Sequence, residues 1–135
     1  MQNVLIIGWG ISGKGACKLL LSQGAKVSVY NDSPIDLTDF PQVTDVSGKD
    51  NFDVIEGKDL VVISPSISQE HHLVEYAKRY SVPVIGEIEL GFRFCKGKIV
   101  AVTGTNGKTT TTKLIGDILN SSGKKAYALG NIGKS

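Results

Sequence analysis

Short apolar runs alternate along this chain with stretches whose apolar residues recur every three or four positions. Residues 3–7 and 60–64 are apolar without alternation, as strands buried on both faces of a parallel sheet are. Between them Ala16, Leu19 and Leu20 have helical spacing, and Gly24 follows where a helix-terminating glycine is expected. The pattern predicts an α/β protein with a Rossmann-like parallel sheet flanked by helices.

The predicted elements form two units. A domain over 1–95 is expected to have strands at 3–7, 26–30, 43–46, 60–64 and 82–85, and helices at 12–23, 51–55, 69–80 and 87–94. A second unit, 96–135, is expected to have a strand at 98–103, a glycine-containing loop at 104–108, a helix at 109–120 and a strand at 125–129. This order predicts a Rossmann-like domain followed by the first βαβ unit of a P-loop ATPase domain.

Composition excludes some classes of function. Fifteen basic and thirteen acidic residues give a net charge of +2, without the dense basic face that nucleic acid requires. The apolar runs are far shorter than the ~20 residues that span a bilayer, and no signal peptide is expected. Cys17 and Cys95 form no CxxC pair, so we expect reduced thiols in a cytoplasmic protein that binds neither nucleic acid nor membrane.

The first motif is a GxGxxG between a predicted strand and helix, made by Gly8, Gly10 and Gly13. Glycines let the backbone turn tightly and approach a diphosphate, with the helix N-terminal amides directed at the anion. Asp32 ends the second strand 19 residues after Gly13, where an acidic side chain reaches a ribose hydroxyl or a base edge. The alternative is that these glycines serve only close helix–strand packing and that Asp32 is a solvated loop residue.

The second motif is Thr103-Gly104-Thr105-Asn106-Gly107-Lys108-Thr109-Thr110, between a predicted strand and helix. Backbone amides of such a loop surround the β- and γ-phosphates of ATP, Lys108 neutralises their charge, and the Thr109 hydroxyl binds Mg²⁺. Val102 occupies the first glycine position of the general P-loop pattern, so the match is not a strict one. Predicted ATP-binding residues are Gly104, Thr105, Asn106, Gly107, Lys108, Thr109 and Thr110.

These residues carry a family resemblance. TGTNGKTT at 103–110, with GNIG at 130–133, resembles the ATP-binding loop of the Mur ligases. GWGISG at 8–13, SPSI at 64–67 and GEIEL at 86–90 are similar to the branch that adds D-glutamate to UDP-N-acetylmuramoyl-L-alanine in peptidoglycan synthesis. The resemblance covers the whole chain but only about the first third of such an enzyme.

The resemblance implies a three-domain enzyme that binds the UDP-sugar peptide in the first domain, ATP and Mg²⁺ in the second and the amino acid in the third. ATP would phosphorylate the L-alanyl carboxylate to an acyl phosphate, which the amine of D-glutamate then attacks. Positioning and charge neutralisation supply most of such catalysis.

Roles follow from the resemblance position by position. Lys108 and Thr109 would be catalytic, with Thr109 also the metal ligand. Pro34 stands where some relatives have a basic residue, and Ser66 stands where glycine is common, which leaves the uridine contacts open. The UDP-sugar site would comprise Gly8, Gly10, Ile11, Ser12, Gly13, Asp32, Ser33, Ser64, Ser66 and Asn131.

Three further expectations concern residues 98–135. Because a second acidic Mg²⁺ ligand and the amino-acid domain are missing, we expect the chain to bind its ligands without catalysing ligation. For the same reason ATP affinity should be weaker than micromolar. The apolar predicted strands cannot be buried by one helix, so we expect cover from the first domain or by self-association.

Two rival interpretations stay open. GxGxxG with Asp32 is also typical of an NAD(H)-binding or redox-sensing module, although such a module has no use for the downstream phosphate loop. Another amino-acid-adding Mur ligase, or the related folate polyglutamate synthase, would share that loop. His71 and His72 lie in a predicted helix, where neighbours point to different sides, so we expect no metal chelate.

Overall fold

The computed structural model describes residues 2–130. The chain divides into two compact units, Met1–Cys95 and Lys96–Ser135.

The first unit is built on a five-stranded sheet of order β3-β2-β1-β4-β5, in which every pairing is parallel. Its strands are β1 (Asn3–Ile7), β2 (Lys26–Tyr30), β3 (Thr44–Asp45), β4 (Leu60–Ile63) and β5 (Val84–Gly86). Central strands β1 and β4 are almost wholly buried, which explains their uninterrupted apolar sequence. The predicted fold class is confirmed.

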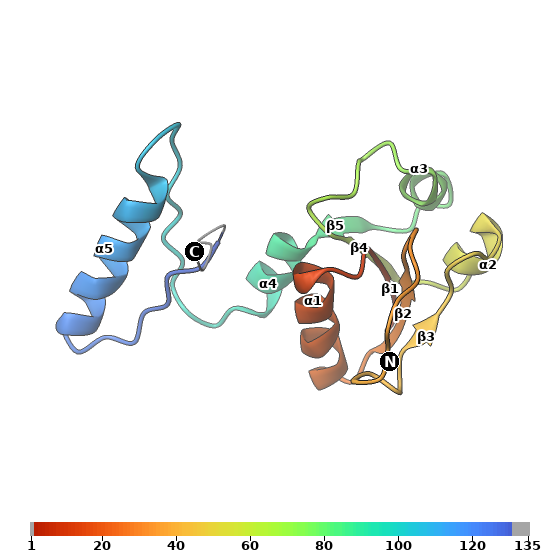
Figure 1. The fold of residues 1–135 in the computed structure, drawn as a ribbon, viewed down its shortest axis with the longest axis horizontal. Coiled ribbons are helices and arrows are strands. Elements are labelled where there is room, and N and C mark those ends of the chain that lie inside the picture. The colour runs from red at the N-terminus through yellow and green to blue at the C-terminus, as the bar shows by residue number, and fades with distance from the viewer. Residues whose placement is uncertain (1, 131–135) are drawn as a thin grey trace. The chain divides into compact units, whose positions relative to one another are not determined.

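Helices cover both faces of this sheet (Figure 1). One face packs against α1 (Ile11–Ser22) and α4 (Glu87–Phe94), through buried residues such as Leu20 and Leu90. The other face packs against α2 (Asn51–Ile55) and α3 (His72–Arg79), through residues such as Val54 and Leu73. The carboxyl ends of β1, β2 and β4 are thereby held in a fixed frame.

Several element boundaries differ from those predicted. The strand expected at 43–46 is limited to Thr44–Asp45 at the sheet edge, and the helix expected at 69–80 begins only at His72. The delay has a local cause: Ser68 accepts the Glu70 amide through its hydroxyl at 3.1 Å and the His71 amide through its carbonyl at 3.1 Å. These bonds form a turn, and His71 then caps the helix.

The second unit contains α5 (Lys108–Ser121), one residue longer at each end than predicted. The strands predicted at 98–103 and 125–129 are wrong, since neither segment forms a strand among the described residues. A parallel strand exists only when a neighbour pairs with it, and apolar spacing alone supplies no neighbour. The segment after α5 is instead held by Asn120, whose side chain accepts the Ala126 amide at 3.0 Å and donates to its carbonyl at 3.1 Å.

No helix within residues 2–130 has both the length and the apolar character that crossing a bilayer requires.

Candidate functional site

The turns after three strands meet at one edge of the sheet. β1 lies between β2 and β4, so the strand order reverses at its carboxyl end, where open parallel sheets bind ligands. Backbone hydrogen bonds join the turns: the Gly8 amide donates to the Tyr30 carbonyl at 2.9 Å, and the Ser64 amide donates to the Ile7 carbonyl at 3.0 Å. The predicted residues around Gly8, Asp32 and Ser64 are therefore on neighbouring loops.

Gly8 and Gly13 are needed for packing. Gly8 has φ +98°, and a Cβ there would lie 2.9 Å from the Ser64 side chain. A Cβ at Gly13 would lie 2.1 Å from the Gly8 carbonyl oxygen. These two glycines bring the start of α1 directly against the end of β1, as the packing interpretation of the motif required.

Gly10 is different, because packing does not explain it. Its φ of −84° and ψ of −165° suit any residue, and a Cβ would meet no atom within 4 Å. Gly10 is the N-cap of α1, so the open space adjoins the first turn of the helix, whose amides have no partner within the helix. That turn carries no acidic residue. Ile11, 94% exposed, and the half-buried Ser12 flank the space, which suits a diphosphate.

Asn31 joins the glycine turn to the loop after β2, and the sequence interpretation missed it. Its side-chain oxygen accepts the Trp9 amide at 3.0 Å, and its side-chain nitrogen donates to the Ser33 carbonyl at 2.8 Å. Asp32 and Ser33 are exposed on this loop, beside the turn. The available signal was an asparagine directly after the second strand, but the motif directs attention to the acidic residue that follows it.

The predicted uridine-side residues Ser64 and Ser66 have different environments. Ser64 is buried, and its hydroxyl donates to the Gly8 carbonyl at 3.2 Å, so it supports the turn from beneath. Ser66 is exposed above the same edge. Trp9 is buried against Phe40, and its indole N–H donates to the Asp36 carbonyl at 3.1 Å. Trp9 therefore packs the loop and is not available to stack on a ligand.

His71 and His72 contact each other, contrary to prediction. Their rings stack with centroids 4.3 Å apart, because His71 precedes α3 and does not follow helical geometry. The His71 Nε2 lies 3.9 Å from an Asp32 carboxylate oxygen. Burial, and then the neighbouring His72, lower the pKa of His71, while Asp32 opposes that change. Within the described part of the chain no group of three or more His, Cys, Asp or Glu could hold a metal ion.

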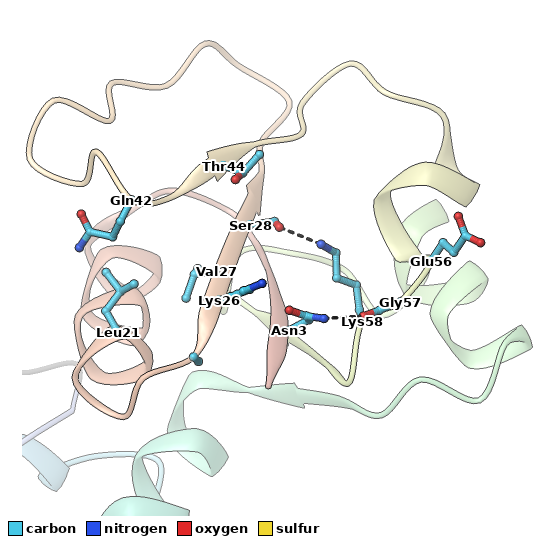
Figure 2. A pocket seen from close by; sticks show the side chains of 11 residues that line it. Asn3, Leu21, Lys26, Val27, Ser28, Gln42, Thr44, Glu56, Gly57 and Lys58 are labelled. Carbon is cyan, nitrogen blue, oxygen red and sulfur yellow. Dashed lines mark hydrogen bonds between the residues drawn. The ribbon is translucent and has the colours of Figure 1, made fainter. Parts of the chain in front are cut away.

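A cavity of about 580 Å³ lies at the opposite end of the strands (Figure 2). Its lining includes Asn3 and Lys26, the first residues of β1 and β2, and the half-buried Lys58. The Lys58 ammonium donates to the Ser28 hydroxyl at 2.8 Å, and burial, followed by the charge of Lys49, lowers the pKa of Lys58. Ligands of open parallel sheets bind outside the carboxyl ends, so this cavity is not the predicted nucleotide site.

The phosphate-loop residues lie at the start of α5. Gly104 and Gly107 have φ values of +149° and +73°, conformations that disfavour any side chain. Gly107 is the N-cap of α5, and the Lys108 ammonium donates back to the Gly104 carbonyl. Thr109 and Thr110 are exposed in the first turn, as are Thr105 and Asn106 in the loop. Asn131 lies outside the described residues.

Two family models match this chain. Residues 2–86 match the family model of the Mur ligase MurD-like N-terminal domain, and residues 102–135 match that of the Mur ligase middle domain. The chain therefore belongs to the Mur ligase family.

Within that family, the chain resembles the N-terminal region of UDP-N-acetylmuramoylalanine–D-glutamate ligases. It is 40% identical to the ligase of that name from Thermoanaerobacter pseudethanolicus and 42% identical to that from Koribacter versatilis. Each match covers 98% of this chain and 31% of the relative, so the chain spans about a third of their length. A murein peptide ligase from Psychrobacter arcticus has the same fold, with a TM-score of 0.63 and 24% identity, over 91% of this chain and 27% of that one.

Proposed function

We propose that this chain is the nucleotide-binding part of an ATP-dependent ligase that adds D-glutamate to UDP-N-acetylmuramoyl-L-alanine through an acyl phosphate. Residues 1–95 would bind the UDP-sugar, and residues 96–135 would begin the ATP-binding domain. The assignment of these two substrates is supported by the likeness of the chain to relatives that are named UDP-N-acetylmuramoylalanine–D-glutamate ligases. A peptidoglycan precursor is made in the cytoplasm, which is the location we propose.

The observation that carries the proposal is the unfilled space at Gly10. It adjoins the N-cap of α1, at the point where the strand order reverses, and the neighbouring Trp9 amide is bonded to Asn31 at the start of the loop that carries Asp32 and Ser33. A diphosphate there would accept hydrogen bonds from the amides of Ile11 and Ser12 and would be stabilised by the helix dipole. The uridine would extend toward the loops after β2 and β4.

The α5 loop supports the proposal that ATP binds with Mg²⁺. Positive φ values at Gly104 and Gly107 shape a backbone that can follow phosphate oxygens, and Lys108 supplies the single cation inside the loop. The exposed Thr109 hydroxyl would be a Mg²⁺ ligand, and the metal would neutralise phosphate charge. The residues present therefore fit the phosphates and provide part of a Mg²⁺ coordination shell.

Calorimetric titration of the wild-type chain with UDP-N-acetylmuramoyl-L-alanine tests the proposal. Gly10→Val should keep the fold, because the backbone suits valine and the space is open, yet its side chain would fill the diphosphate position. We expect its affinity to fall by about tenfold or more, equivalent to ~1.4 kcal/mol or more.

Gly15→Ala is the matched control, since Gly15 is also exposed in α1 with open space around its Cβ position. Its affinity should equal that of the wild type. Absence of wild-type binding, or wild-type affinity in Gly10→Val, contradicts the proposal.

NADH in the same titration tests the rival NAD(H)-binding function. That function predicts NADH binding that Asp32→Asn weakens, together with no response to the UDP-sugar. The proposed function predicts the reverse order of affinities.

Exposed apolar side chains of the second unit support a further proposal, that residues 98–135 self-associate. Ile99, Val100, Leu114 and Ile118 are each more than half exposed. Light scattering across a hundredfold range of protein concentration should show mass increasing with concentration. A constant monomer mass would exclude this association.

A further inference from the structure

A hydrogen bond from the Leu73 amide defines the tautomer of His71, and the other ring nitrogen lies near Asp32. The His71 Nδ1 accepts the Leu73 amide at 3.3 Å and so caps α3. A nitrogen that accepts a hydrogen bond carries no proton, so a neutral His71 has its proton on Nε2. That Nε2 is the atom 3.9 Å from the Asp32 carboxylate.

The imidazole is confined in this orientation. The His71 side chain is only 12% exposed, with His72 stacked at 4.3 Å and the Tyr30 ring edge-on at 5.8 Å. The Asp32 side chain, by contrast, is 68% exposed at the mouth of the proposed nucleotide site. An enclosed N–H donor therefore faces a largely exposed carboxylate.

Tyr30 approaches the same carboxylate from β2. Burial raises the pKa of the Tyr30 hydroxyl, and the charge of Asp32 and a hydrogen bond with it raise that pKa further. The groups facing His71 are Tyr30 on β2, Asp32 on the following loop and His72 on α3, and Asp32 is the one carboxylate among them.

We propose that His71 is a positioning residue for the nucleotide site: its Nε2–H attracts the Asp32 carboxylate electrostatically and favours the orientations directed toward the bound sugar nucleotide. This rests on the proposed function, because it assigns a task to Asp32 in that site. His71 itself touches no substrate. Its role is to reduce the number of orientations that Asp32 adopts before the ligand arrives, which lowers the entropic cost of binding.

His71→Asn separates the two tasks of the side chain. Asparagine is a good N-cap and can still accept the Leu73 amide, but it is too short to reach Asp32. We expect a melting temperature close to that of the wild type and an affinity for UDP-N-acetylmuramoyl-L-alanine weaker by about threefold to tenfold. His72→Phe is the control, because the contacts of His72 with His71 and Tyr30 are ring contacts that phenylalanine retains, so the affinity should stay at the wild-type value.

A double-mutant cycle with Asp32→Asn then identifies the route. In the Asp32→Asn background, His71→Asn should cause no further loss of affinity. An undiminished loss in that background, or wild-type affinity in His71→Asn alone, overturns the proposal.

A measurement without ligand distinguishes failure of this inference from failure of the proposed function. Nitrogen-15 chemical shifts of the His71 ring in the 135-residue chain should show the Nε2–H tautomer near neutral pH, and the Asp32 carboxyl carbon-13 shift should change in His71→Asn. A Nδ1–H tautomer would overturn the inference. The expected shifts, combined with no binding of the UDP-sugar, would leave the positioning intact and reject the function.

Discussion

Gly13→Ala should sharply destabilise the first unit. The added Cβ would lie 2.1 Å from the Gly8 carbonyl oxygen and 3.3 Å from the Ser64 hydroxyl oxygen. A carbon–oxygen contact needs about 3.3 Å, so the first distance is short by more than an ångström. The opposing atom is backbone that already accepts the Ser64 hydroxyl, and it cannot rotate away as a side chain would.

To remove this steric clash, α1 would have to move away from β1. Overpacking of this kind costs about 1–3 kcal/mol, and the rigid backbone on both sides places this case near the upper value. About 3 kcal/mol corresponds to a fall in melting temperature of roughly 12–24 °C for a unit of this size. Urea and thermal unfolding followed by circular dichroism would measure it.

Gly15→Ala provides the comparison for stability as well. It adds the same methyl group to the same helix, at an exposed position with nothing within 4 Å, and should stabilise the protein by about 0.5–1 kcal/mol. A Gly13→Ala protein within about 0.5 kcal/mol of the wild type would show that the close approach of helix and strand is not a real constraint.

Three other outcomes are expected. Burial raises the pKa of the Cys17 thiol to about 11, whereas Cys95 is exposed. At pH 8 a thiol reagent should therefore modify Cys95 in the native protein and Cys17 only after unfolding. Equal modification rates for the two cysteines would contradict this. Lys108→Ala should weaken ATP binding by about tenfold or more, whereas Lys113→Ala, an exposed lysine of the same helix, should not; calorimetry decides. Burial lowers the pKa of His71 from 6.5, so as the pH falls the unfolded chain protonates this imidazole before the folded chain does. The free energy of unfolding should therefore decrease below about pH 6.5. The decrease should be steeper in the wild type than in His71→Asn.

The sequence predicted the structure best where the type of residue depends on local backbone geometry and burial alone. Buried strands β1 and β4 were predicted because residues inside a parallel sheet must be apolar throughout. The position of the glycine turn was predicted because the GxGxxG motif directly follows the first of these strands and precedes a stretch with helical spacing. The predicted roles of Lys108, Thr109 and the UDP-sugar residues remain predictions.

Failures occurred where distant partners decide the structure. The segments at 98–103 and 125–129 have strand-like sequences, but strand formation depends on neighbours that sequence spacing does not provide. Asn31 and the paired rings of His71 and His72 were missed for a related reason. Their roles arise from contacts with Trp9, Asp32 and Tyr30, made by loops that only the fold brings together.

The shortness of β3 has a consequence for how this protein can assemble. A long edge strand offers a row of unsatisfied amides and carbonyls on which another chain can continue the ladder, as in fibril growth. Here the sheet is bounded by β3, with two residues, and β5, with three. Edges this short present few unpaired backbone groups, and short edge strands are one of the ways in which folded sheets disfavour edge-to-edge pairing with another chain.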